Sequence, residues 1–404
     1  MARLDFRGQM PHADAGGLAE RGLTGRGYAL TTFPHSTPMK PQLTLVATLL
    51  LLVAEPSAFV AAQQPITLND VPEGLPVITA DEPKAGRFSP EKAAEYLDRS
   101  ALNWQKTKKC ATCHTNLFYM AARPALAKVQ PDSGEVRGFY EDYRKVRWQA
   151  KRPTEGQGFW PVVVGTGLTL NDLQTTGKLS DVAREVLDIM WTVQRADGSW
   201  KWPHCNYAPL EIDDHYGVTL AALTIGIAPG GYAETPQARA GLDKLRVYLK
   251  NNPPKSLHHR AMLAWCSVRV DGIATQDERD QTLAELLALQ LDDGGWSTAG
   301  LLTDWKVRSD GQPLATQISD GYGTGFVIVL ARELGVPADN PRLARGIDWL
   351  MANQRESGKW FTRSPVRECS NLLSNAGSAF DVLALQACGK LPGWPFTDIR
   401  RVAK

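Results

Sequence analysis

The chain has 404 residues, of which 43% are hydrophobic and 22% are charged, an ordinary composition for a globular protein. Its length allows one large domain or two small ones. The formal net charge is only +2, so the charge balance gives no support to nucleic acid or to an anionic membrane surface as a partner.

The first part of the chain is predicted to lie outside the fold. Residues 1–38 are rich in Gly, Arg and small polar residues and show no apolar period, which indicates an untranslated or disordered extension. Residues 39–62 have the layout of a secretory signal peptide: Lys40 is the positive region, Leu43 to Ala54 the apolar run, and small residues follow. The run is short for a membrane span, although an uncleaved anchor is an alternative. We therefore expect an exported protein, periplasmic or secreted, with no transmembrane span in the mature chain.

A haem attachment signature follows a predicted linker at residues 63–88. The stretch KKCATCHTNLF contains Cys110, Cys113 and His114 in the order Cys-x-x-Cys-His. Two thiols at this spacing form thioethers with the haem vinyl groups, and the following His ligates the iron. We predict covalent haem c, which suits an exported protein. A structural disulfide or half of a zinc site is the alternative.

The second axial ligand of such a haem is left open by the sequence. Met120 lies on the same predicted helix as His114 and cannot reach the opposite face of the haem. His215, His258 and His259 lie near the starts of predicted helices and are candidates for the sixth ligand, and a five-coordinate iron is also allowed. The sequence does not determine disulfide pairing among the other cysteines, which are Cys205, Cys266, Cys369 and Cys388.

A short repeat occurs three times between residues 194 and 360. The pattern Gln-x-x-x-Gly-x-Trp occurs as QRADGSW at 194–200, QLDDGGW at 290–296 and QRESGKW at 354–360. The Gln lies at a helix end, where it can bond exposed backbone groups. The Gly allows a left-handed turn, and the Trp then packs between neighbouring helices.

Helices are predicted to alternate along residues 89–390, before a C-terminal tail at 391–404. Outer, amphipathic helices are expected near 89–103, 135–150, 180–194, 236–251, 275–290 and 340–354. Inner, more apolar helices are expected near 113–127, 161–177, 213–227, 256–270, 321–334 and 374–388. The sequence therefore predicts an all-α fold, in which six helix pairs close into a single α6/α6 toroid.

The three Gln-Gly-Trp copies resemble the QW repeats of squalene–hopene cyclases and related terpene cyclases. One copy, at 354–360, has the complete lead-in RGIDWLMAN. The resemblance covers roughly residues 89–390 and implies an α/α toroid, a fold shared with protein prenyltransferases. It also implies an apolar ligand of isoprenoid type in the ring cavity. Because the Cys-x-x-Cys-His motif opens the first inner helix, a ring of helix pairs would place the haem at the cavity mouth.

This resemblance leaves the activity open, because one fold serves many functions. If the protein is an enzyme, it is a terpene cyclase-like isomerase or a haem-dependent redox enzyme. The alternative is a non-catalytic redox or haem-binding toroid with a redox partner.

An acidic cluster carries the cyclase interpretation. The stretch LEIDDHYG contains Glu211, Asp213 and Asp214. Class II terpene cyclases use Asp-x-Asp-Asp, so the resemblance implies that Asp213 is the proton donor and that Glu211 and Asp214 hold the proton in place. The alternative is that Asp213 caps a helix, as Asp320 would in a later repeat.

The resemblance to prenyltransferases adds a zinc hypothesis. Those enzymes hold zinc with Asp, Cys and His at the cavity mouth. In this chain the corresponding set would be Asp213, Cys110 or Cys113, and His114.

Overall fold

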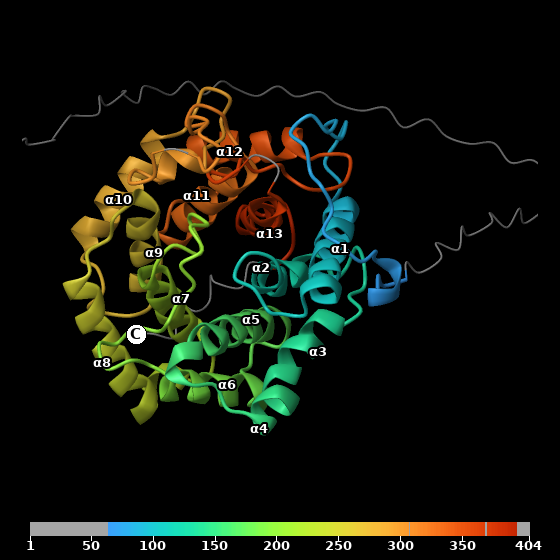
Figure 1. Ribbon diagram of the computed structural model, residues 1–404. Helices are drawn as coiled ribbons and strands as arrows, with labels where there is room; N and C mark the ends of the chain where they lie inside the picture. The colour runs from blue at the N-terminus through green and yellow to red at the C-terminus, as the bar shows by residue number, and fades with distance from the viewer. Residues whose placement is uncertain (1–63, 307, 368–369, 394–404) are drawn as a thin grey trace, which may run out of the picture. The chain divides into compact units, whose positions relative to one another are not determined.

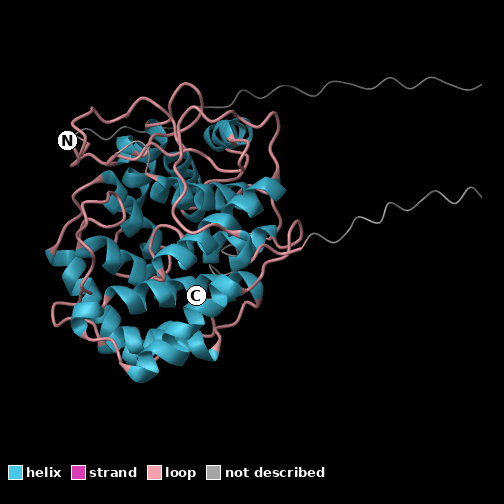
Figure 2. Cartoon of the chain, turned by 45° about the vertical axis from the view of Figure 1, so that its right-hand side comes forward, coloured by secondary structure: helices cyan, strands magenta, loops and turns pink. Residues whose placement is uncertain are grey.

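The computed structural model describes residues 64–306, 308–367 and 370–393, which all belong to one unit of the chain, residues 61–404. The predicted extension at 1–38, the signal peptide at 39–62 and most of the tail at 391–404 lie outside the described residues. Within those residues the all-α prediction is confirmed: Figure 2 shows helices and loops without strands, and the pairing of extended backbone is limited to two isolated bridges. No described helix is both long enough and apolar enough to cross a membrane.

The helices begin and end close to the predicted boundaries. The predicted outer helices are α1 (Pro90–Lys108), α3 (Glu135–Asp142), α6 (Asp181–Thr192), α8 (Pro236–Asn251), α10 (Gln276–Ala288) and α12 (Pro341–Asn353). The predicted inner helices are α2 (Asn116–Ala122), α5 (Phe159–Thr175), α7 (Asp214–Ile227), α9 (Leu257–Ser267), α11 (Gly321–Glu333) and α13 (Asn371–Ala387). The second outer helix differs from its prediction, because a π-helical turn at Tyr143–Arg147 separates α3 from the short α4 (Trp148–Ala150).

Side-chain caps explain why the outer helices begin where they do. Ser89, Ser180, Thr235 and Thr275 each precede a helix and accept a hydrogen bond from the backbone N–H three residues later. This contact satisfies one of the N–H groups that a helix start leaves without a partner. The start of these helices is therefore encoded locally.

The inner helices contact one another in a closed order. α2 packs against α5, α5 against α7, α7 against α9, α9 against α11, α11 against α13, and α13 against α2. Figure 1 shows α1, α3, α6, α8, α10 and α12 on the outside of these helices. The inner helices are buried on most sides, which agrees with their apolar sequences.

The three repeated tryptophans occupy equivalent environments. Trp200, Trp296 and Trp360 are fully buried. The indole N–H of each donates to the carbonyl ten residues earlier in the chain, at 2.9, 2.8 and 2.7 Å respectively. The prediction that the repeat has one structural role is confirmed for the Trp.

The repeated glutamines link each motif to another outer helix. The Gln194 side-chain amide donates to the carbonyl of Gly241 in α8, and that of Gln290 donates to the carbonyl of Arg342 in α12. The side chain of Gln354 joins the last motif to the first helix: its Nε2 donates to the Ser89 carbonyl at 2.9 Å, and its Oε1 accepts from the Ser89 N–H at 2.7 Å. The same contact that joins neighbouring repeats therefore also joins the two ends of the helical region.

Candidate functional site

The Cys-x-x-Cys-His motif lies in the turn between α1 and α2. Lys109 ends α1 in the left-handed conformation, with φ of 53°, and reverses the chain just before Cys110. The Tyr143 hydroxyl then accepts a hydrogen bond from the Ala111 N–H at 2.8 Å. The motif therefore lies at its predicted position, the start of the first inner helix.

A pocket of about 500 Å³ opens beside this turn. Three chain segments, residues 104–114, 156–160 and 201–211, supply nearly all of its wall, and Cys110 and His114 are part of it. The remaining wall is largely aromatic, with Trp104, Phe159, Trp160 and Trp202. Its volume lies within the range of about 300–1,000 Å³ that is usual for cofactor sites, and apolar walls with few polar groups are typical of them.

His114 is held in a neutral form on the pocket wall. Its side chain is only 3% exposed, and burial lowers its pKa to about 3. Its Nδ1 lies 2.8 Å from the Thr115 hydroxyl, and its ring packs edge-on against Trp104. No other residue in the described part of the chain bonds Nε2, which leaves that nitrogen available. A neutral imidazole oriented through one nitrogen is the form in which His ligates a metal through the other.

The two motif thiols are free and differ in exposure. Cys113 is fully buried, whereas Cys110 is half-buried on the pocket wall. Cys113 Sγ donates to Glu211 Oε1 at 3.0 Å. Burial, followed by the negative charge of Glu211, raises the pKa of the Cys113 thiol well above its usual value. Cys110 thus lies on the pocket wall and Cys113 contacts the wall residue Glu211, and both are thiols, the form from which thioethers are made.

Glu211 and Cys205 belong to this site in a way that the sequence did not reveal. Both line the pocket, and the Cys205 N–H donates to the Glu211 carbonyl at 2.9 Å within a tight turn. Burial and the Glu211 carboxylate raise the pKa of the Cys205 thiol. Cys113 and Glu211 are 98 residues apart, and no local pattern links positions at that separation. Glu211 was predicted as part of an acid catalyst, and the structure has it beside the thiols.

Asp213 is the N-cap of α7. Its carboxylate accepts from the Tyr216 N–H at 3.3 Å and lies 3.5 Å from Nε2 of His259. Burial alone raises the pKa of Asp213, but the hydrogen bond and charge of His259 outweigh it and bring the pKa down to about 2. Asp320 caps α11 in the same way. The capping alternative is thus observed, and an ionised Asp213 is poorly suited to donate a proton.

Asp214 bonds side-chain and backbone groups that hold the loop before α7 in place. Its carboxylate lies 2.6 Å from an Arg195 guanidinium nitrogen and 3.0 Å from the Trp202 backbone nitrogen. His204 Nε2 lies 3.1 Å from the same side chain. These contacts hold the loop before α7, so a role in proton transfer for Asp214 remains a prediction that no contact favours.

The three candidate histidines for the sixth ligand lie elsewhere. None of His215, His258 and His259 is among the residues that line the pocket of His114. The His215 and His259 rings lie 4.7 Å apart, and both His215 ring nitrogens are buried without a hydrogen-bond partner. His258 Nε2 lies 2.9 Å from the Tyr322 hydroxyl. The structure gathers these residues at the N-termini of α7 and α9 and not at the motif.

Aromatic side chains fill the space between several inner helices. The ring of His258 stacks on Phe326 and Tyr322, with centroids 4.6 and 5.9 Å apart. Phe380 of α13 packs edge-on against Tyr322 and Phe326. All of these side chains are buried. These side chains therefore pack against one another between α9, α11 and α13.

The zinc hypothesis finds no ready set of ligands. Asp213 does not line the pocket that holds Cys110 and His114. Across residues 64–306, 308–367 and 370–393, no three His, Cys, Asp or Glu side chains are arranged to hold a metal ion.

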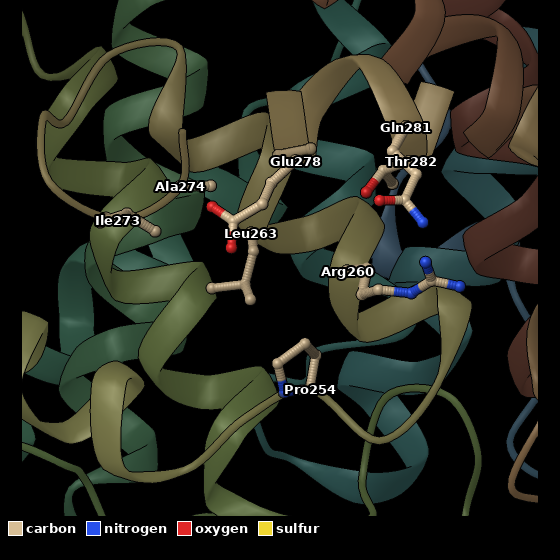
Figure 3. Close-up of a pocket in the computed structure, with 9 residues that line it drawn as sticks. Pro254, Arg260, Leu263, Ile273, Ala274, Glu278, Gln281 and Thr282 are labelled. Carbon is tan, nitrogen blue, oxygen red and sulfur yellow. The ribbon is translucent and has the colours of Figure 1, made fainter. Parts of the chain in front are cut away.

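A second pocket, between α9 and α10, carries no residue of the motif or of the acidic cluster. Figure 3 shows Leu263 and Arg260 of α9 facing Glu278 and Gln281 of α10 across it. Its volume is about 110 Å³, which suits a few water molecules and not a cofactor. The pocket at residues 104–114, which Cys110 and His114 line, is taken as the candidate functional site.

Comparison of the chain with models of known protein families gives no match, and comparison with curated proteins gives no relative.

Proposed function

We propose that this protein is an exported haem c protein built on a squalene cyclase-like α/α toroid, and that it serves as a redox or haem-binding protein. The observation that carries the proposal is that Cys110 and His114 share the wall of one aromatic pocket of about 500 Å³, with Cys113 directly beside it. The Cys-x-x-Cys-His order and the predicted signal peptide point the same way.

The residues of the site have separate roles in this proposal. Cys110 and Cys113 would hold the haem through thioethers, and His114 would offer Nε2 as an iron ligand while Thr115 fixes its other nitrogen. Trp104, Trp160 and Trp202 exclude water from the porphyrin. Bound haem supplies a one-electron couple whose potential depends on axial ligands, burial and nearby charge.

The toroid is supported by two features. The inner helices contact one another in a closed order, and Gln354 joins the last motif to the first outer helix. In a ring of helix pairs, the inner N-termini all face one end, so the motif before α2 would place the haem at the mouth.

The redox alternative is favoured over the cyclase alternative by two observations. Asp213, predicted as the proton donor, caps α7 with a pKa of about 2. Buried aromatic side chains, including Tyr322, Phe326 and Phe380, pack against one another between the inner helices. An isoprenoid ligand therefore has less support than a haem in the pocket at the motif.

The proposal is tested by measuring whether haem is covalently bound to the chain. The full chain is expressed with its export signal in a host that matures c-type cytochromes, purified and denatured, and haem absorbance is followed on the polypeptide. We expect the absorbance to remain with the chain, because thioethers survive denaturation. Cys110→Ala with Cys113→Ala should release it, and Cys388→Ser, far from the motif in sequence, should not. A colourless protein that contains zinc, or one in which Cys110 and Cys113 form a disulfide, would contradict the proposal.

A further inference from the structure

The pocket beside the motif offers a sixth iron ligand that is not one of the predicted histidines. Haem iron in proteins is ligated by His, Cys, Met or Tyr side chains. On the described wall, apart from Cys110 and His114, only Cys205 is of one of these types. The inference rests on the proposed function.

The other polar side chains on the same wall are less suitable. Glu211 already accepts a hydrogen bond from Cys113 Sγ at 3.0 Å. Lys201 is exposed, as Cys205 is, but an ammonium group is not among the usual ligands of haem iron. Tyr207 is not on this wall; its ring centroid lies 6.4 Å from that of His114, and its hydroxyl bonds the Ser370 side chain.

Cys205 lies on a chain segment from which its sulfur can reach the pocket. It lies in the 201–211 loop, whereas His114 comes from the turn before α2, so the two ligands reach the pocket from different chain segments. The loop is fixed at both ends: the Trp202 indole donates to the Leu210 carbonyl at 2.8 Å, and the Cys205 N–H donates to the Glu211 carbonyl at 2.9 Å. Cys205 itself is a free thiol.

A second observation points to a ligand in this pocket. The His114 side chain is 97% buried on the wall, and Nε2 is bonded by none of the residues that the structure describes. Two groups with affinity for iron, one imidazole and one thiol, thus line one apolar pocket. We propose that Cys205 is the second axial ligand of the covalently bound haem. As an iron ligand the Cys205 thiol would lose its proton, and the Glu211 carboxylate beside it would be the acceptor.

The experiment compares matured wild-type protein with Cys205→Ala and with Cys388→Ala as the matched control. Electronic absorption and paramagnetic resonance spectra of the ferric protein report the ligation. We expect wild type and Cys388→Ala to be six-coordinate and low-spin with a sulfur ligand. Cys205→Ala should be five-coordinate and high-spin, and should bind added imidazole at concentrations that leave wild type unchanged.

Further variants separate the possible outcomes. Cys205→His should restore six-coordination with a different spectrum, which shows that the loop reaches the iron. Identical spectra for wild type and Cys205→Ala, or loss of the ligand in Lys201→Ala with Cys205 intact, would overturn the assignment. In each of these cases the haem stays on the denatured chain. A colourless wild-type chain instead overturns the proposed function, and this inference with it.

Discussion

Cys113 Sγ donates a hydrogen bond to Glu211 Oε1 across 3.0 Å, although the two residues are 98 positions apart. The contact ties the turn before α2 to the loop before α7. It joins the predicted haem motif to an acidic cluster that the sequence assigned to different chemistry. The Glu211 carboxylate therefore influences the protonation of the motif thiols.

Replacing Glu211 should change the reactivity of Cys113. Burial is the larger cause of the raised pKa of this thiol, and the charge of Glu211 adds to it. In Glu211→Gln the charge is gone, so the pKa of Cys113 should fall toward its usual value and alkylation of haem-free protein at pH 8 should be faster. Mass spectrometry of the Cys113 peptide measures the rate. Cys266, which is buried far from this loop in sequence, is the internal control, and an equal acceleration there would indicate general loosening.

Asp213→Asn should keep the helix cap but remove the part of the stability that depends on an ionised carboxylate. Asn caps a helix about as well as Asp, so little change is expected near neutrality from the cap itself. The pKa of Asp213 in the folded protein is about 2, below the usual value of 3.8. A lowered pKa contributes stability that is present above the unfolded value and is lost as the pH falls through the folded one.

Wild type should thus lose about 2 kcal/mol from this group between about pH 4 and pH 2, and the variant should not. Urea unfolding at a series of pH values measures the difference. Parallel pH profiles for the two proteins would show that the ionised form of Asp213 is not stabilised by folding.

The three repeated tryptophans should contribute about equally to the free energy of unfolding. Replacing Trp200, Trp296 or Trp360 with Phe removes a buried indole hydrogen bond and leaves a small cavity, which should cost about 1–3 kcal/mol in each case. Trp305 is only partly buried and serves as the control. Its replacement with Phe should reduce the free energy of unfolding by less. Denaturant unfolding gives the free energies. A large difference among the three would contradict their equivalence.

Gln354→Ala should loosen the junction between the two ends of the helical region. The side chain makes two hydrogen bonds with Ser89 and one with the Gly358 carbonyl, so the loss should be about 2 kcal/mol. Hydrogen exchange should rise at the start of α1, which Ser89 caps. Gln194→Ala is the matched control, since it removes the same motif contact elsewhere and should leave exchange at α1 unchanged.

The positions of the helices follow largely from local sequence. Apolar residues at helical period and caps such as Ser89 and Thr235 act within a single turn, so the boundaries of α8 and α11 agree with their predictions to within a residue. The repeat also identified Gly358, whose φ of 95° only glycine adopts readily and whose added Cβ would lie 2.0 Å from the Lys92 carbonyl. The π-helical turn after α3 had no such local signal.

The composition of the candidate site was decided by tertiary structure. The sequence identified Cys110, Cys113 and His114 because their spacing is itself the chemical signature. It assigned Glu211 to an acid catalyst and passed over Cys205, since a contact between segments 98 residues apart depends on how α2, α5 and α7 pack and not on any local period. Tertiary contacts likewise decide the charge of two side chains: His259 keeps Asp213 ionised against the effect of burial, and burial keeps His114 neutral.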